Sequence, residues 1–413
     1  MIARGNDSRR EILTTVDDPT SQTAGPEPQA SGRTRPVSDD GPRTIEVKAS
    51  QIDNAYAVLL AIARHQYGDG TAAGVRQAAD ADINWPYLSK LASAQAVEPL
   101  TYHTLRQTSA DLLPPEITSH IDAYQQSLNV RNNFIIQELG RITRLLEAKS
   151  VPMLVLKGPV LAQVAYGNVN LRRYVDIDVL IQREDLEAAE EALSDHGYEL
   201  FDKVSRLGPY RRAVYQYLAQ QRAYRRGNGL FNLDLHTRLM PPGMPYTVPF
   251  SELWARSASL RFDQDVRAQR LASEDILLIL CYHGAKNQWS SLKHVFDIAA
   301  LIASVDLQWD VIAQRAKRVH AERILGLGLL MAHKMVGCAV PQALIAAPRV
   351  PEALGEAASR LEVRLRRRQS GRSMPLSYAE RVKLYLLLQD TWANKLRYML
   401  FSAARNVWDT WIK

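Results

Sequence analysis

The alternation of apolar and polar positions divides the chain into a helical first part, a middle with short strands, and a helical remainder. From Ile52 onward, apolar residues recur at spacings of three and four, and the same spacing returns over residues 88–92 and 128–145. This spacing places apolar side chains on one face of a helix. The last of these helices is predicted over about 115–149. We therefore predict a helical N-terminal subdomain over residues 47–150.

The middle of the chain, residues 151–270, has short apolar runs between turn residues, which is typical of strands. A strand from Met153 to Leu156 is followed by a Lys157-Gly158 turn and a short helix. A second apolar run carries Asp176 and Asp178, and a helix is predicted over about 183–194. Further strands are predicted at 198–201, 214–218 and 230–236, the last two joined through an Asn-Gly pair that favours a hairpin.

The remaining segments complete a mixed α+β fold, in which a small sheet lies between helical regions. Residues 1–46 contain almost no large apolar side chains and are predicted to form a disordered tail. Residues 271–413 are predicted to be helical. Near the C-terminus, Trp408 and Trp411 lie beside Arg405 and Lys413, which would suit an amphipathic helix on a membrane surface. We favour a helix that packs on the body of the protein.

The two aspartates of the middle segment are the first candidate for chemistry. Asp176 and Asp178 are two residues apart in a predicted strand, so their side chains should share one face. Neighbouring carboxylates in an apolar strand need a compensating cation. Mg²⁺ or Mn²⁺ prefers such oxygen ligands and completes its shell with substrate phosphates. An isolated Asp-x-Asp is often only a solvated loop, but its apolar context here favours a metal site.

The Lys157-Gly158 turn supplies the complementary half of a nucleotide site. It opens a helix, whose free backbone N–H groups and positive end attract phosphate, and Lys157 adds an ammonium group. Together with the aspartates, the turn predicts a site for a metal-bound nucleoside triphosphate.

The order of these motifs resembles a known family. Leu156-Lys157-Gly158, a helix, Arg172 four residues before Asp176-Ile177-Asp178, His196-Gly197-Tyr198, Asp234-Leu235-His236, and then His283-Gly284, Trp289, Leu292-Lys293 and Asp297 follow one another along the chain. This order is similar to that of the bacterial uncharacterised nucleotidyltransferases of the DNA polymerase β superfold. The resemblance runs from about Ile52 to about Ile302 and implies a polymerase β-type sheet. The wider superfold has Gly followed by Ser or Gly and a shorter gap to the acidic pair, so the phosphate contacts are expected to differ here.

The resemblance also implies roles for individual residues. Asp234 matches the third acidic position, so Asp176, Asp178 and Asp234 are the predicted catalytic residues and metal ligands. Asp234 could instead be a solvated aspartate at the edge of a strand, and His236, on the same strand face, could orient it, contact the acceptor or cap the hairpin. The predicted nucleotide-binding residues are Lys157, Gly158, Arg172, Arg173, His236, His283 and Lys293.

Two groups of charged residues admit a structural explanation as well. His283, Lys293 and Asp297 could face the nucleotide or acceptor, or could form a buried polar network that docks the helices on the sheet. A looser basic group is more readily a solvated surface than an acceptor site; it comprises Arg211, Arg212, Arg222, Arg225 and Arg226.

Composition narrows the function further. The formal net charge of +7 over 413 residues falls short of the dense basic stripe of a nucleic-acid-binding protein, and two cysteines are too few for a disulfide framework or a zinc site. No apolar run is long enough to span a membrane, so no stable membrane insertion is expected. The N-terminus carries charges where a signal peptide needs apolar residues, which favours the cytoplasm.

The predicted function is a Mg²⁺-dependent nucleotidyltransferase. It would move a nucleotidyl group from a nucleoside triphosphate to a hydroxyl or phosphate of a peptide, a sugar or another small molecule, as in natural-product biosynthesis. The alternatives are a non-catalytic nucleotide-binding module and a glycosyltransferase that uses Asp-x-Asp. The second is disfavoured because about a hundred helical residues stand where such enzymes have a long α/β domain.

Overall fold

The computed structural model describes residues 47–201, 221–241, 244, 247–346, 352–366 and 376–412, with side chains up to residue 404. The predicted fold class, a mixed α+β protein with a small sheet between helical regions, is confirmed. The predicted disordered tail, the predicted strand at 214–218, and Arg211 and Arg212 lie outside the described residues. So do the side chains of Arg405, Trp408 and Trp411, and Lys413 as a whole.

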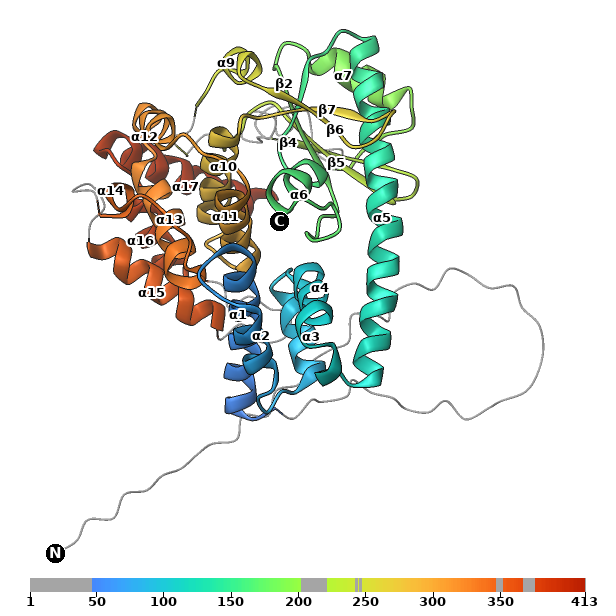
Figure 1. Cartoon of the computed structure of the whole chain (residues 1–413). Coiled ribbons are helices and arrows are strands. Elements are labelled where there is room, and N and C mark those ends of the chain that lie inside the picture. The colour runs from blue at the N-terminus through green and yellow to red at the C-terminus, as the bar shows by residue number, and fades with distance from the viewer. Residues whose placement is uncertain are drawn as a thin grey trace, which may run out of the picture.

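The N-terminal part is helical, as predicted. It contains α1 (Ala49–Tyr67), α2 (Ala72–Ala79), α3 (Trp85–Ala94), α4 (Glu98–Thr108), a short 3₁₀ turn (Ala110–Leu112) and α5 (Pro115–Ala148). The first four helices pack together, whereas α5 runs from their far end along the whole side of the sheet (Figure 1). Leu139, Ile142 and Leu146 form its buried stripe against the sheet. A helix of 34 residues thereby runs from the N-terminal helices to the sheet.

Within the described residues, the sheet has seven strands in the order β3-β4-β5-β2-β1-β7-β6. Its strands are β1 (Met153–Val155), β2 (Ile177–Ile181), β3 (Glu199–Leu200), β4 (Gln221–Arg226), β5 (Phe231–His236), β6 (Ala258–Arg261) and β7 (Arg267–Arg270). The helices α6 (Pro159–Tyr166) and α7 (Leu186–Ser194) connect the early strands. Strand β2 is central, antiparallel to β1 and parallel to β5, with Asp178 opposite Asp234. The candidate carboxylates therefore meet in the middle of the sheet.

Three details of the sheet differ from the sequence-based expectations. Strand β2 begins at Ile177, so Asp176 precedes the strand, and Val175 is exposed where an apolar strand position was expected to be buried. The partner of β5 is β4, a strand that was not predicted. Its last two residues, Arg225 and Arg226, pair with Asn232 and Phe231. The turn itself lies at Gly227–Gly229, where Asn228 adopts the expected left-handed conformation. Strands β6 and β7 were not predicted, although Ala258, Leu260 and Phe262 alternate with polar residues as in a strand.

The C-terminal part is again helical. It contains α10 (Ser273–Lys286), α11 (Leu292–Ser304), α12 (Trp309–Arg318), α13 (Glu322–Val336), α14 (Gln342–Ile345), α15 (Glu352–Arg366), α16 (Tyr378–Leu387) and α17 (Trp392–Ile412), whereas the short α9 (Phe250–Ala255) lies between β5 and β6. One apolar core joins α1, β1, α10 and α15 through Leu59, Leu154, Leu277 and Leu361. A second core fills the space between the sheet, α5 and α7. Among the described helices, none is both long and apolar enough to cross a membrane.

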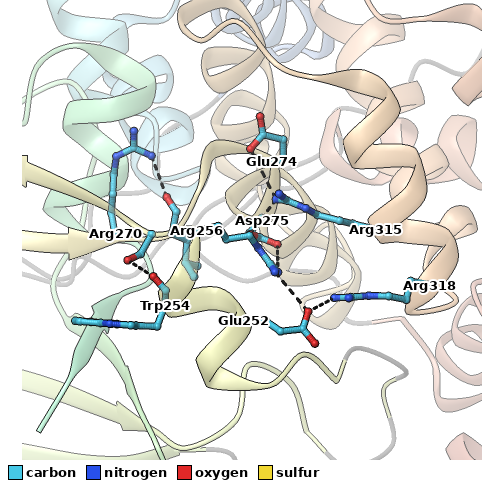
Figure 2. Close-up of polar contacts among 10 residues, drawn as sticks. Glu252, Trp254, Arg256, Arg270, Glu274, Asp275, Arg315 and Arg318 are labelled. Atoms are coloured by element: carbon cyan, nitrogen blue, oxygen red, sulfur yellow. Dashed lines mark hydrogen bonds and ion pairs between the residues drawn. The ribbon is translucent and has the colours of Figure 1, made fainter.

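Ion pairs fasten the segment that leads from the sheet into the C-terminal helices. Asp275 of α10 is buried and accepts hydrogen bonds from Arg256, at 2.6 and 3.0 Å, and from Arg315 of α12, at 3.0 Å. Glu252 of α9 pairs with Arg318 of α12 at 2.7 Å (Figure 2). Because Asp275 is held by two guanidinium groups, α9, α10 and α12 are fixed relative to one another.

Candidate active site

The parallel pairing of β2 with β5 assembles the centre of the site. Asp178 lies opposite Asp234 and Leu180 opposite His236. Since side chains two residues apart share a strand face, His236 joins the two aspartates on one side of the sheet. One ligand atom from each of Asp178, Asp234 and His236 lies within 4.8 Å of the other two. Such a group can hold a metal ion.

Asp178 has two different oxygens. Its Oδ1 lies 3.0 Å from Lys157 Nζ and 3.1 Å from His236 Nε2, whereas its Oδ2 and His236 Nδ1 are buried without a hydrogen-bond partner among the described residues. Burial, with the side chain 1% exposed, raises the pKa of the Asp178 carboxyl, but Lys157 and His236 lower it by more, so the pKa lies below its usual range. Asp178 is therefore ionised and keeps one oxygen for another cation.

The Lys157-Gly158 turn lies next to Asp178 because β1 is the neighbour of β2. The Leu156 amide donates to the Asp178 carbonyl at 2.9 Å, which places the turn at the head of α6. Gly158 adopts φ +67°, and a Cβ at this position would lie 3.2 Å from the Asp176 carbonyl oxygen. Only glycine avoids this strain. Burial lowers the pKa of Lys157, but Asp178 and Asp176 raise it by more, so Lys157 remains a cation.

The pKa of Asp234 is shifted in the opposite direction from that of Asp178. Asp234 is partly buried, and its Oδ2 accepts a hydrogen bond from Gln221 Nε2 at 2.7 Å. Burial, and then the negative charge of Asp178, raise the pKa of Asp234 to about 6. A carboxylate in this state binds a proton or a cation readily. The pair thus combines a firmly ionised aspartate with one that titrates near neutrality.

Asp176 lies at the edge of this centre. It precedes β2, is partly buried, and is not one of the three residues whose ligand atoms cluster. Its charge nonetheless acts on Lys157, Arg172 and Lys293, whose pKa values it raises. Its role as a metal ligand stays a prediction.

The two predicted triphosphate arginines are paired with carboxylates. Arg172 is buried and donates to both oxygens of Asp297 on α11, at 2.7 and 2.8 Å, and Tyr166 donates to the same carboxylate at 2.7 Å. Arg173 pairs with Glu98 of α4 at 2.7 Å. These contacts dock α11 and α4 on the loop that leads to Asp176. Contact of either arginine with nucleotide stays a prediction.

Two further predicted residues come from α10 and α11. Burial, followed by the charge of Arg172, lowers the pKa of Lys293 to about 7. Burial and the charge of Lys157 lower the pKa of His283 well below its usual value. His283 is therefore neutral, and its Nε2 lies 3.2 Å from Asn287 Nδ2.

A cavity of about 200 Å³ opens over the aspartates. Its polar wall comprises Lys157, Arg172, Asp178, Gln221, Asp234, His236, His283 and Lys286, and its apolar wall comprises Leu156, Leu239, Met240, Ile276, Ile279 and Leu280. Gln221 and Lys286 were not predicted. Lys286 follows His283 by three residues on α10, a spacing that could have indicated a shared face. Gln221 had no such signal, because its strand was placed elsewhere.

The looser basic group takes part in structural contacts. Arg222 pairs with Glu190 of α7, and Arg226 bonds to Glu138 of α5, with its Nε at 2.6 Å. The Arg225 guanidinium lies over the Phe201 ring at 3.1 Å. These three side chains brace the hairpin against its neighbours.

Comparisons with known proteins were made for the fold and for the sequence. A solution structure of the antibiotic-resistance factor ANT(2'')-Ia is 14% identical with a TM-score of 0.32, and covers 46% of this chain and 90% of that chain. A crystal structure of ANT(2'')-Ia in complex with adenylyl-2''-tobramycin is 13% identical with a TM-score of 0.33, and covers 45% of this chain and 95% of that chain. These similarities are too low to carry an argument. A comparison with curated proteins found no match.

A family model gives a clear result. The model described as "Uncharacterised nucleotidyltransferase" matches residues 81–337, which is 257 of the 413 residues. The match includes α5, the Lys-Gly turn, both strands that carry the aspartates, and the helices with His283 and Asp297. The chain therefore belongs to this family of uncharacterised nucleotidyltransferases.

Proposed function

We propose that the protein is a nucleotidyltransferase that depends on Mg²⁺ or Mn²⁺ and transfers a nucleotidyl group from a nucleoside triphosphate to a hydroxyl or phosphate acceptor. The observation that carries the proposal is the meeting of Asp178, Asp234, His236 and Lys157 at one cavity. A protein that only bound nucleotide would not need two adjacent carboxylates with opposite pKa shifts.

The residues present fit a divalent metal ion. Asp178 offers a buried oxygen that lacks a hydrogen-bond partner in the described part of the chain. Beside it, the negative charge of Asp234 is disfavoured by burial and by the charge of Asp178, so a cation would stabilise it. Carboxylate oxygens are the ligands that Mg²⁺ and Mn²⁺ prefer. Asp176, Asp178 and Asp234 would hold the ion, with His236 fixing Asp178. When bound, the ion would offset the carboxylate charges and polarise the reacting phosphoryl group.

The protein's own side chains would divide the remaining work. Lys157 and the first turn of α6 would bind the phosphates, because both present positive charge. The cavity is smaller than the roughly 300–1,000 Å³ of typical ligand pockets, so it suits the triphosphate end while the nucleoside lies outside it. As the acceptor oxygen bonds to the α-phosphorus and the bond to pyrophosphate breaks, Asp234 would take the proton of the acceptor hydroxyl.

Two substitutions test this division. Asp178→Asn should weaken nucleotide binding in the presence of metal and should also lower turnover, because it removes the ionised ligand. Asp234→Asn should leave nucleotide affinity within about tenfold, but lower single-turnover transfer by about 10²–10⁴, as loss of a positioned base does. The exposed Asp306→Asn serves as the matched control. If Asp234→Asn abolished nucleotide binding while Asp178→Asn did not, the roles would be reversed.

The transfer reaction is followed with α-labelled nucleoside triphosphates, Mg²⁺ or Mn²⁺ and a cell extract as the source of acceptor. Labelled product together with released pyrophosphate supports the proposal. Metal-dependent nucleotide binding without transfer would identify a binding module, and release of nucleoside diphosphate from a nucleotide sugar would identify a glycosyltransferase. An acceptor on a peptide, a sugar or another natural product, and a cytoplasmic location, are parts of the proposal that rest on the sequence.

A further inference from the structure

The last described helix carries an apolar stripe that faces away from the protein. On α17, Trp392 is 80%, Leu396 55%, Met399 43% and Leu400 64% exposed. These positions recur at spacings of three and four, so they share one face of the helix. The packed face is the more polar one, with Asn394 and Tyr398 buried. The expectation that this helix packs on the body therefore holds for only one of its sides.

Exposed apolar side chains also occur on the two preceding helices. Of the twelve large apolar residues that are exposed in the described part of the chain, six lie on α15, α16 and α17; besides the stripe, they are Val363 and Tyr378. A contiguous exposed apolar surface marks an interaction site, whereas scattered single residues do not. Beside it, α15, α16 and α17 line a groove of about 620 Å³, whose wall includes Leu361, Leu384 and Leu387.

Positive charge is concentrated in the same segment. Residues 352–413 contain 12 Lys and Arg against 6 Asp and Glu, which is +6 of the net +7, and among their described side chains there are 7 Lys and Arg against 5 Asp and Glu. Two cations contact the exposed aromatic rings: Lys395 Nζ lies 4.5 Å from the Trp392 ring centroid, and the Arg381 guanidinium 5.4 Å from that of Tyr378. The wall of the groove contains Arg360 and Lys383 together with Glu356 and Glu380, and Arg360 pairs with Glu356 at 3.3 Å.

We infer that α17 and the adjoining groove bind the surface of an anionic lipid bilayer. Aliphatic side chains with an exposed tryptophan suit the boundary between acyl chains and headgroups, while flanking Lys and Arg suit anionic headgroups. The groove has an apolar wall for an acyl chain and cations for its phosphate. An acidic protein could also take an apolar helix face, but a tryptophan beside leucines with flanking cations is the composition of a helix that lies in a membrane interface. The contact is peripheral and separate from the candidate active site.

The test is flotation of the full-length protein with vesicles of phosphatidylcholine, with or without phosphatidylglycerol. We expect binding to the anionic vesicles, weakened by salt, and little binding to the neutral ones. Leu396→Glu with Leu400→Glu should lower the bound fraction about tenfold or more, because two carboxylates would face the lipid. The matched control, Val130→Glu with Phe134→Glu on α5, changes two side chains that are 53% and 56% exposed and should bind like the wild type.

Circular dichroism confirms that each variant is folded, and light scattering gives its oligomeric state. Absence of wild-type binding to anionic vesicles at low salt would overturn the proposal, as would equal binding by the α17 and α5 variants. A wild-type dimer that fails to bind vesicles and becomes a monomer on Leu396→Glu with Leu400→Glu would show an interface between copies instead. None of these outcomes depends on nucleotidyl transfer.

Discussion

The contrast between Asp178 and Asp234 predicts that the same substitution at two paired strand positions will change stability in opposite directions. Asp234→Asn removes a carboxylate whose pKa is raised, from 3.8 to about 6, by burial and by the charge of Asp178. Each pKa unit corresponds to about 1.4 kcal/mol, so the ionised side chain destabilises the native state by up to about 3 kcal/mol. Partial exposure to solvent makes this an upper value. Without metal, Asp234→Asn should therefore stabilise the protein at neutral pH.

The pH dependence follows from the direction of the shift. Because the native state holds the Asp234 proton more tightly than the unfolded state, the wild type loses stability as the pH rises from about 4 to about 6. Below about pH 4 the carboxyl is protonated in both states, so wild type and Asp234→Asn should be equally stable. Above about pH 6 the gain in stability should be constant. In a protein of this length, a gain of about 3 kcal/mol should raise the melting temperature by roughly 4 °C.

Asp178→Asn should have the opposite effect. The Asp178 pKa is lowered overall, since Lys157 and His236 outweigh burial, so its ionised form stabilises the native state above the unfolded pKa and this contribution is lost at low pH. The substitution also leaves Lys157 without its ion-pair partner. Breaking such a buried pair costs about 3–5 kcal/mol.

The assay is thermal and urea unfolding of both variants and the wild type between pH 4 and pH 8, with EDTA present. Added Mg²⁺ and nucleotide should then stabilise the wild type more than either variant, because they bind the native state alone. The reasoning fails if Asp234→Asn is neutral or destabilising at pH 8, or if Asp178→Asn is stabilising.

Three further substitutions test other parts of the site. Gly158→Ala should cost about 1–3 kcal/mol of stability and weaken nucleotide binding, because φ is +67° here; equal stability of Gly158→Ala and the unhindered Gly355→Ala would contradict this. Nucleotide affinity should fall from pH 6 to pH 8 as Lys293 loses its proton near pH 7, and calorimetric titration should show a smaller fall in Lys293→Met. Asp297→Asn leaves the buried Arg172 without its bidentate partner and should cost about 3–5 kcal/mol in urea unfolding, and a loss below 1 kcal/mol would show that the pair does not dock α11.

Much of the sheet could be predicted, because its information is local in the sequence. The apolar runs around Leu154 and Val179 predict two strands, and the structure pairs these strands antiparallel across the intervening α6. The spacing of two between Asp234 and His236 correctly placed both side chains on one face. Strands β6 and β7 form a local hairpin, with Ala258 opposite Arg270, and they were missed because each strand has only four residues.

The partners of charged residues could not be predicted, because they come from distant parts of the chain. Nothing near Arg172 in the sequence indicates that Asp297 occupies both of its donors, and nothing near Lys157 indicates that it shares Asp178 Oδ1 with His236. The start of β2 at Ile177 rather than earlier is a similar case. The loop before it is held by Arg172 and Arg173, whose carboxylate partners lie on α11 and α4.

The separation of Arg172 and Asp297 along the chain has a consequence during protein synthesis. Their 125 residues take roughly 6–25 s to translate at about 5–20 residues per second. The strands from β2 to β7 are synthesised within that interval, and until it ends the guanidinium that anchors the loop before Asp176 has no carboxylate to meet. A nascent chain that ends before α11 therefore lacks the ion pair that holds this loop, and under the proposed function nucleotide would begin to protect the new protein only late in its synthesis.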